Sequence, residues 1–287
     1  MADHGVPVKV DDEWNLGIPY ANVAGEWKAL NFAYVNVNGV WKQSWANFNQ
    51  ATGGTVTDVD NYNGTGEKWR VHEFTSNGTF DVKVAANPFR ILLFGGGGSR
   101  GSGNQGGGGA GGHIEDDAYS ITPGSYSISI GKHGNYPSYG QGGNGGNTTA
   151  FGLTALGGGG GGYFRGGGGT AGSSGGCGGG GGGGGRKGGA GPGGGGGGGS
   201  QGGHGGSGGT DPGTAGNSSI APGGGGGGAG GPAKSDGNTY SYGQTVPGPA
   251  KDFDITGTKV SKGKGGGTYG GSWNGSDGGV VIAYRIG

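Results

Sequence analysis

The chain has 287 residues, of which 91 are glycine, and its 18 basic and 18 acidic residues give a formal net charge of zero. A neutral chain has little general attraction for nucleic acid or for an anionic membrane surface, so the composition argues against both as partners. No apolar run approaches the ~20 residues that a membrane-spanning helix needs, and we expect no membrane insertion.

Residues 1–5 contain neither the basic nor the apolar stretch of a signal peptide. We therefore expect the chain to be made in a cytoplasm and to reach any other location as part of a larger assembly.

A tryptophan-containing repeat occupies residues 1–48, where tryptophans recur at spacings of 13 and 14 residues. In each copy an alternating strand leads into a two-residue turn, most clearly at Asn38-Gly39, which is a strong hairpin signal. We predict three small hairpins whose tryptophans share one core. These tryptophans are Trp14, Trp27, Trp41 and Trp45. A module of this size is marginally stable alone, so we expect it to dock onto a partner.

Residues 49–66 are polar and contain several glycines and asparagines, so they are predicted to form a linker. From residue 67 onward β-rich segments return, and none shows helical periodicity with caps. The predicted strands are Trp69–Phe74, Thr79–Val84, Arg90–Phe94, Ala118–Ile121, Tyr126–Ile130, Phe151–Leu156, a weaker Phe253–Val260 and the closing Val280–Ile286. The closing strand must pair with earlier ones, which makes the glycine-rich region an insertion.

Unbroken glycine runs separate the later strands. They are Gly157–Gly162, Gly166–Gly169, Gly178–Gly185, Gly193–Gly199 and Gly223–Gly228. Such runs break the triplet register of collagen, which leaves disorder or a lattice of polyglycine-II helices with three residues per turn and ~3.1 Å rise. The flanking strands favour the lattice, in which backbone groups of neighbouring helices bond to each other. The predicted fold is all-β, with a β-sandwich over residues 67–287 whose long insertion is a polyglycine-II bundle.

Large aromatic rings cannot enter a glycine lattice, so they must cover its sides or stand at loop tips. Tyrosine and tryptophan on rigid loops offer a large contact area at low entropic cost. The receptor-binding candidates lie in polar, turn-rich stretches and are Tyr136, Tyr139, Tyr240, Tyr242 and Trp273. Tyr163 and Phe164 lie between glycine runs and are expected to pack. The alternative is that all these rings seal the lattice against water or a neighbouring subunit.

Catalytic and metal-binding patterns are weak in this sequence. Gly96-x-Gly98-x-x-Gly101 matches a dinucleotide fingerprint, but no helix follows it, so we expect no phosphate site. Glu115–Asp117 is interpreted as a solvated strand edge. Cys177, the single cysteine, is expected to fill space among glycines. The histidines are scattered, so we predict no catalytic residues, no metal site and no cofactor.

Several motifs occur in a fixed order along the chain. They are Val71–Phe80, Arg90–Phe94 leading into Gly95–Gly98, Ile121–Gly131, Asn147–Gly157 and Gly278–Ile282. This order resembles the glycine-rich domains of bacteriophage tail proteins. The Gly-x-Trp-Lys hairpins of residues 20–45 are similar to modules of phage tail and fibre proteins. The composition also resembles glycine-rich adhesins at the tips of some tail fibres, a group known for packed polyglycine-II helices.

The resemblance implies a non-enzymatic virion component of a phage tail, made in the host cytoplasm. Residues 1–48, with their tryptophans, would attach the chain to other virion tail proteins, and the lattice loops would bind a host-cell receptor, either a glycan or a surface protein. A homo-oligomer is expected, since trimers are common in fibres. One alternative is a purely structural minor tail or capsid-decorating protein. A more distant one is ice binding, although the threonines form no regular row.

Overall fold

In the computed structural model, the described residues are 6–10, 13–17, 20–30, 32–46, 48–102, 106–165, 168–180, 197–201, 226–233, 248–265 and 275–286. Across these ranges the secondary structure consists of β-strands and one 3-10 turn, η1 (Tyr62–Gly64), with no α-helix. The predicted all-β fold class is confirmed.

The first strands form three separate antiparallel hairpins. They are β1 (Val6–Val10) with β2 (Glu13–Gly17), β3 (Tyr20–Val23) with β4 (Glu26–Ala29), and β5 (Phe32–Val37) with β6 (Val40–Ala46). At Asn38-Gly39 both turn residues have positive φ, 53° and 83°, as the tight hairpin turn requires. The side-chain oxygen of Asn36 accepts the Gly39 N–H at 2.9 Å and so stabilises this turn. The hairpin prediction is confirmed.

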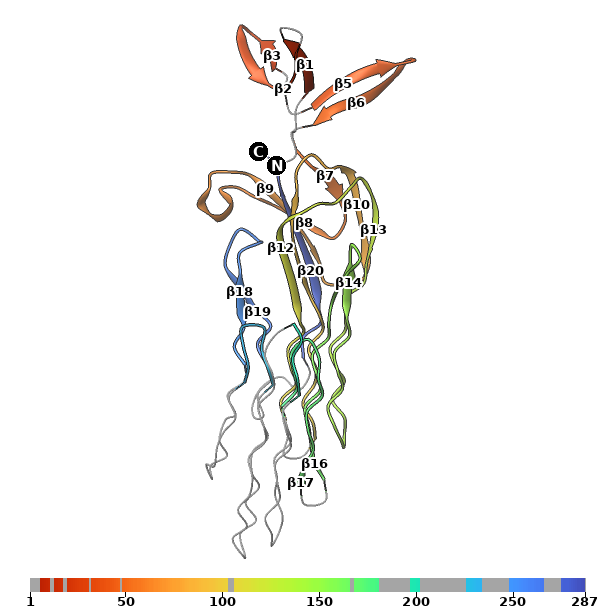
Figure 1. Ribbon diagram of the computed structural model, residues 1–287, viewed down its shortest axis with the longest axis vertical. Coiled ribbons are helices and arrows are strands. Elements are labelled where there is room, and N and C mark those ends of the chain that lie inside the picture. Colours follow the sequence, from red (N-terminus) through yellow and green to blue (C-terminus); the bar gives the residue numbers. More distant parts are fainter. Residues whose placement is uncertain are drawn as a thin grey trace, which may run out of the picture.

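The shared tryptophan core is wrong for Trp27, whose side chain is 70% exposed on β4. A two-stranded hairpin has too little apolar surface to enclose a ring of that size. The side chains of Trp14, Trp41 and Trp45 lie outside the described part, although their backbones lie in β2 and β6. Figure 1 draws the hairpins beyond one end of the remaining structure.

Residues from 48 onward form two facing antiparallel sheets. The five-stranded sheet has the order β12-β11-β20-β9-β8 and the three-stranded sheet the order β13-β10-β7. Their strands are β7 (Gln50–Thr52), β8 (Thr55–Val59), β9 (Trp69–Phe74), β10 (Gly78–Val84), β11 (Phe89–Phe94), β12 (His113–Tyr119), β13 (Gly124–Ile128) and β20 (Gly279–Arg285). The closing strand β20 pairs with both β11 and β9, as expected of a strand that follows an insertion.

The predicted linker over residues 49–66 is wrong. β7 pairs with β10, and β8 pairs with β9, so this stretch supplies an edge strand to each sheet. Nearly every side chain of β8 is exposed. An edge strand with polar, solvent-facing side chains has the composition of a loop, which explains the misleading sequence pattern.

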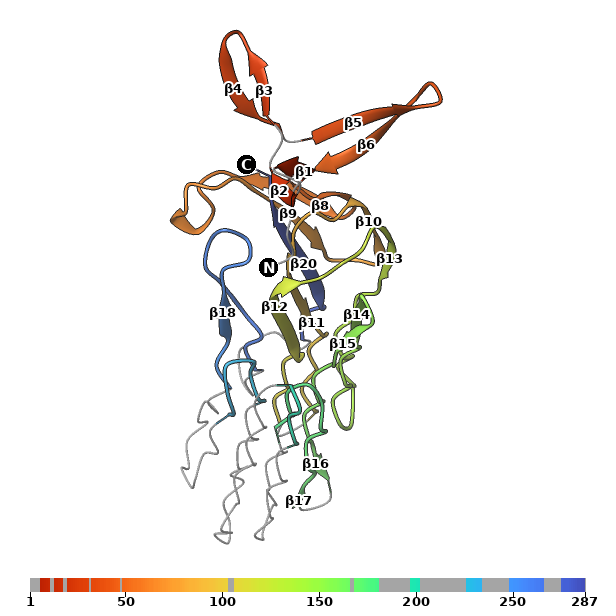
Figure 2. The ribbon, with the colours of Figure 1, turned by 45° about the horizontal axis from the view of Figure 1, so that its top comes forward.

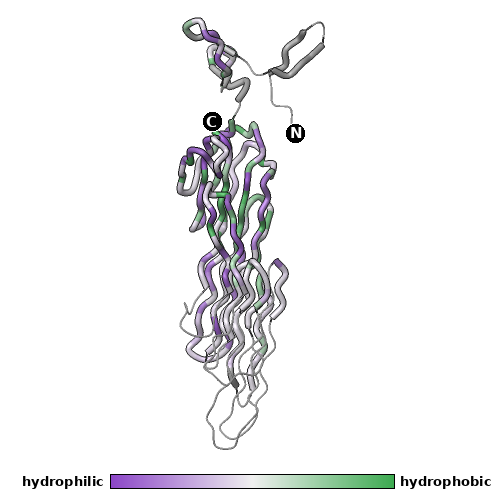
Figure 3. The backbone as a smooth tube through the Cα atoms, turned by 90° about the vertical axis from the view of Figure 1, so that its left-hand side faces the viewer, coloured by the Kyte–Doolittle hydropathy of each residue, from purple (hydrophilic) through white to green (hydrophobic). Residues whose placement is uncertain are grey.

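Each face of the five-stranded sheet covers a hydrophobic core. Phe80, Ile91 and Ile282 lie between the two sheets and are fully buried. Leu92 points to the opposite face, where Phe253 covers it. Because successive side chains of a strand alternate in direction, β11 must be apolar on both faces. Figure 3 shows the hydrophobic residues gathered in this sandwich, beside a pale glycine-rich part.

Several predicted strands have different bounds in the structure. The strand predicted at Ala118–Ile121 begins and ends earlier, as β12 (His113–Tyr119), and the strand predicted at Tyr126–Ile130 is β13 (Gly124–Ile128). Phe151, with φ of 55°, turns the chain between β14 (Thr148–Ala150) and β15 (Leu153–Ala155), so 151–156 is not one strand. The weak strand over 253–260 is a hairpin of β18 (Lys251–Phe253) and β19 (Val260–Lys262) with a turn between them. A further short pair, β16 (Phe164–Arg165) with β17 (Gly168–Gly169), lies in the glycine-rich part.

Strands of the sandwich continue directly into glycine-rich segments at one end. Residues 95–102 follow β11, residues 106–112 precede β12, and residues 275–278 precede β20. Figure 1 and Figure 2 show these segments running side by side away from the sandwich. We call the described segments 95–102, 106–112, 131–147, 156–162, 170–180, 197–201, 226–231 and 275–278 the glycine lattice.

Candidate recognition surface of the glycine lattice

Hydrogen bonds in the glycine lattice repeat every three residues. Within segment 156–162, successive N–H groups point to different neighbouring segments, and every third one returns to the same neighbour. Four bonds that show this are Gly158–Gly96, Gly161–Ser99, Gly159–Cys177 and Gly162–Gly180, with N to O distances of 2.8 to 2.9 Å. Three residues per turn is the period of a polyproline-II helix. The described segments therefore pack backbone against backbone, as a polyglycine-II bundle does.

The interior of the lattice has no room for side chains. A Cβ atom on Gly159 would lie 1.9 Å from the carbonyl oxygen of Ser173, and one on Gly160 would lie 1.9 Å from that of Gly142. These obstructing atoms belong to backbones that are held by their own hydrogen bonds, so they cannot move aside cheaply. Close approach of the backbones, and not an unusual φ, is what requires glycine here.

One carboxylate ties two lattice segments together near the sandwich. Asp277 accepts hydrogen bonds from Lys132 Nζ at 2.8 Å and from the backbone N–H of His133 at 2.9 Å. Its second contact with His133, from Nδ1, is 2.7 Å long. The bond from Lys132, followed by those from His133, holds the pKa of Asp277 well below its usual range. The carboxylate is thus a charged cross-link between residues 131–147 and 275–278.

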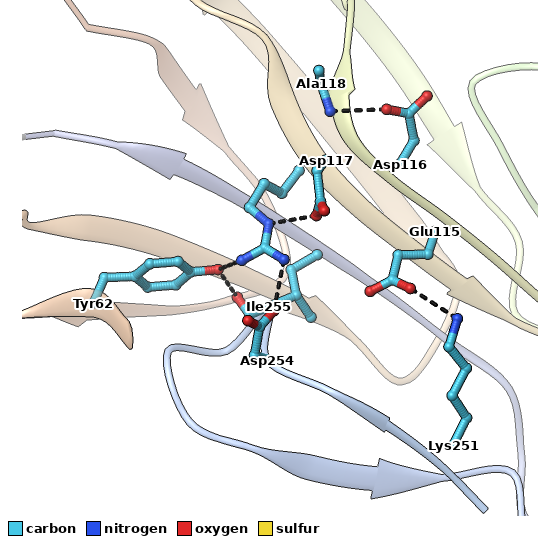
Figure 4. A network of polar contacts seen from close by, with 9 residues as sticks. Tyr62, Glu115, Asp116, Asp117, Ala118, Lys251, Asp254 and Ile255 are labelled. Carbon is cyan, nitrogen blue, oxygen red and sulfur yellow. Dashed lines mark hydrogen bonds and ion pairs between the residues drawn. The ribbon is translucent and has the colours of Figure 1, made fainter. Parts of the chain in front are cut away.

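An arginine network fixes the β18–β19 hairpin on the sandwich (Figure 4). Arg90 donates from Nε to Asp117 at 2.7 Å, from Nη1 to the Tyr62 hydroxyl at 2.8 Å and from Nη2 to Asp254 at 2.6 Å. The Tyr62 hydroxyl in turn donates to the carbonyl of Ile255 at 2.8 Å. Burial raises the pKa of Tyr62 to about 12, so its hydroxyl keeps the proton that it donates. Sequence reasoning missed this network, because its members lie far apart along the chain.

The loop that carries Tyr136 and Tyr139 is fastened to the outer part of the lattice. The N–H of Ser102 donates to the carbonyl of Gly140 at 2.9 Å. Ser102 lies seven residues beyond the first lattice residue, Gly95, or about 22 Å along a polyproline-II segment. The backbone of this loop is therefore held in place at a distance from the sandwich.

The two tyrosines of this loop differ in exposure. Tyr139 is 74% exposed and its ring makes an edge contact with Tyr163, with centroids 5.8 Å apart. Tyr136 is half-buried, and the guanidinium carbon of Arg100 lies 5.3 Å from its ring centre. Tyr139 thus presents an open ring, whereas much of Tyr136 is used in packing. Tyr163 is half-buried, in line with its predicted packing role.

The model of the glycine-rich domain family matches residues 75–285 of this chain. The chain belongs to the glycine-rich domain family. The match covers the sandwich from β10 onward and the whole glycine lattice, whereas the hairpins and β7 to β9 precede it. No curated protein matches the chain.

Three further receptor-binding candidates belong to the glycine-rich domain. Tyr240, Tyr242 and Trp273 lie outside the described residues, and so does the side chain of Phe164. Of the five candidates, the structure therefore brings together Tyr136 and Tyr139 on one loop. Among the four tryptophans predicted to mediate attachment, Trp27 has a described side chain, and it is exposed.

Within the described part of the glycine-rich domain, the fingerprint glycines are engaged in the lattice. The N–H groups of Gly96, Gly98 and Gly101 all donate to backbone carbonyls and so form no cradle for a phosphate. Cys177 is fully buried in the lattice, as predicted.

The predicted solvated edge at Glu115–Asp117 is confirmed as an edge, because β12 is the outermost strand of its sheet. Its acidic side chains are nonetheless paired, Glu115 with Lys251 at 3.0 Å and Asp117 with Arg90.

The described ranges contain no group of three or more histidine, cysteine, aspartate or glutamate side chains arranged to hold a metal ion. Within the same ranges no helix is both long and apolar enough to span a membrane.

Proposed function

We propose that this chain is a component of a bacteriophage tail, and that its glycine-rich domain presents loops that bind a receptor on the host-cell surface. The observation that carries the proposal is the loop of Tyr136 and Tyr139, held by the backbone of the lattice well away from the sandwich. A lattice of peptide groups keeps such a loop in one conformation, so a receptor would bind without the entropic cost of ordering it.

The two ends of the sandwich support a division of tasks. β20 ends beside the start of β9, where Arg285 pairs with Trp69, and the guanidinium of Arg285 lies 5.8 Å from the centre of the Phe48 ring. The chain therefore enters the sandwich from the hairpins at the end opposite the lattice (Figure 2). In this proposal the hairpins attach the chain to other virion proteins, through side chains such as the exposed Trp27, and the lattice faces the host.

The receptor would be a glycan or a surface protein, for which an open tyrosine ring is a suitable contact. Several copies of the chain in one homo-oligomer would multiply a weak contact into firm attachment. The role requires no catalysis and no cofactor.

Competition for adsorption tests the proposal. The purified full-length chain is expected to bind host cells and to reduce the adsorption of intact phage particles. Tyr139→Ala should reduce both effects about tenfold or more, as the loss of an interface hot spot does. The matched control is Tyr34→Ala, which removes another exposed tyrosine, 55% exposed on β5, from the opposite end of the molecule.

Two results would contradict the receptor-binding role. The first is that the full-length chain neither binds cells nor competes with particles, and the second is that Tyr139→Ala and Tyr34→Ala bind equally well. Antibody labelling of intact particles distinguishes the alternative of a purely structural minor tail or capsid-decorating protein. Label at the distal end of the tail supports receptor binding, whereas label confined to the capsid or the tail shaft, or no label, supports the structural role.

A further inference from the structure

A shallow groove runs along one side of the glycine lattice. Its volume is about 550 Å³, and it lies where four lattice segments meet. Its lining includes Asn144, Gly145, Asn147, Gly157, Gly175 and Gly198. Much of this lining is glycine, so backbone peptide groups form a large part of the surface. The groove therefore has the character of a lattice position, and none of the segments that the structure describes occupies it.

At this position two N–H groups of segment 156–162 donate to side chains, as the N–H of Leu156 at the start of the segment does to the side-chain oxygen of Gln201. The N–H groups of Gly158 and Gly161 donate to backbone carbonyls of another segment. The N–H of Gly157 donates instead to the side-chain oxygen of Asn147 at 2.9 Å, and that of Gly160 to the side-chain oxygen of Asn144 at 2.8 Å. Two carboxamides thus supply to Gly157 and Gly160 the acceptors that a neighbouring backbone supplies to Gly158 and Gly161.

The spacing of these carboxamides matches the lattice. Asn144 and Asn147 are three residues apart, which is one polyproline-II turn, or about 9 Å. Gly157 and Gly160 have the same spacing. Both asparagine side chains are exposed, so these bonds lie at the surface of the lattice. Without the carboxamides, this edge would offer unpaired N–H groups at the period of an incoming polyglycine-II strand.

We propose that Asn144 and Asn147 close this edge of the lattice against a glycine-rich segment from a second copy of the chain. The occupant they exclude is a glycine segment, because half of the groove lining, including Gly145, Gly175 and Gly198, is glycine, whose backbone another backbone can approach closely. Another copy of this chain carries such segments in abundance, with 91 glycines. The asparagines play the part that charged side chains and prolines play on the edges of β-sheets, where open edges promote association.

Amide hydrogen exchange and light scattering on the full-length chain test this role. In Asn144→Ala/Asn147→Ala, exchange at Gly157 and Gly160 should accelerate roughly fivefold, the effect of losing one hydrogen bond each. Exchange at Gly158 and Gly161 should stay as in the unsubstituted chain. The molar mass of the double variant should rise with concentration beyond that of the unsubstituted chain.

Two further variants keep the test decisive. Asn144→Asp/Asn147→Asp retains the acceptor oxygens and should match the unsubstituted chain in exchange and in mass. Asn144→Ala alone removes the side-chain acceptor of the Gly160 N–H and leaves that of Gly157. This single variant replaces the double variant in the test if the double variant does not fold.

Unchanged exchange at Gly157 and Gly160 in the double alanine variant would show that the side chains are not their acceptors. Fast exchange without any increase in mass would overturn the proposed closing of the edge.

Discussion

The N–H of Gly158 donates to the carbonyl oxygen of Gly96 at 2.8 Å, which joins the extension of β15 to the extension of β11. β11 and β15 end two to three residues earlier, at Phe94 and Ala155, and the same chain segments continue as polyglycine-II helices. The register set by side-chain packing in the sandwich is thereby passed to a region that has almost no side chains of its own. We infer that the sandwich aligns the lattice.

Substitution of a lattice glycine should destabilise the whole domain. Gly159→Ala places a methyl group where the carbonyl of Ser173 lies, at 1.9 Å from the new Cβ. Because neither backbone can shift without breaking hydrogen bonds, we expect a loss of about 3 kcal/mol, at the upper end for overpacking. Urea unfolding measures this change in free energy.

The matched control is Ser138→Ala, a change at an exposed loop position, which should leave the unfolding midpoint unchanged. Equal midpoints for the Gly159→Ala variant and the unsubstituted chain would contradict the close packing described for this segment.

Particular residues show what the sequence can and cannot predict. Asn38-Gly39 specifies a hairpin because its turn chemistry is local, and the apolar closing strand can only pair inside the sandwich. The edge strand β8, in contrast, has the polarity of a loop, so its pairing with β9 has no local signal. The spacing of Asn144 and Asn147 is a sequence signal for capping of the lattice edge that the sequence analysis did not use. Two asparagines one polyproline-II turn apart match the period of the lattice.

Long-range polar contacts are harder to predict than strands. Arg90 bonds to Asp117 and Asp254, which lie 27 and 164 residues away along the chain. No spacing rule relates such positions, because loop lengths and not local periodicity bring them together. The same holds for the contact between Asp277 and Lys132.

Arg90→Met should release the β18–β19 hairpin from the sandwich. The substitution removes three donors and leaves Asp254 and the hydroxyl of Tyr62 without the guanidinium. We expect a loss of about 2 kcal/mol, less than for a fully buried pair because Asp117 and Asp254 are 66% and 55% exposed. Hydrogen exchange should accelerate most over residues 251–262.

Lys259→Met is the control for this variant, since it breaks the exposed pair of Lys259 with Asp252 and should have little effect. If exchange over residues 251–262 is the same in Arg90→Met and Lys259→Met, the arginine does not anchor the hairpin.

Asp277→Asn should change the acid stability of the lattice. The folded state lowers the pKa of Asp277 from its ordinary 3.8, so the unfolded state binds a proton more readily in acid. The stability that this carboxylate contributes is present above pH 3.8 and is lost as the pH falls through the folded pKa. The variant should be less stable at pH 7 and should lose less stability between pH 4 and pH 2. Thermal unfolding at a series of pH values measures both effects, and parallel curves would contradict the cross-link.

His72 should make the sandwich sensitive to mild acid. Its ring is fully buried, with Nδ1 2.7 Å from the carbonyl of Gly53 and Nε2 3.2 Å from the hydroxyl of Tyr284. A carbonyl can only accept, so Nδ1 carries the proton, and in the neutral ring Nε2 accepts from Tyr284, whose hydroxyl also lies 3.4 Å from the carbonyl of Ala51. A second proton would place a charge on a buried ring, and burial lowers the pKa of His72 below its ordinary 6.5.

The sign of the pH effect follows from this shift. The unfolded chain takes up the proton near pH 6.5, whereas the folded chain resists it, so stability falls as the pH drops below 6.5. The slope for one proton is at most about 1.4 kcal/mol per pH unit. His72→Asn retains a donor for Gly53 but cannot titrate, so it should be less stable at pH 8 and show a flatter dependence between pH 7 and pH 5. A remaining slope is expected from His113, whose pKa burial also lowers. Urea unfolding at each pH provides the measurement, and an unchanged slope in His72→Asn would show that the buried ring is not the titrating group.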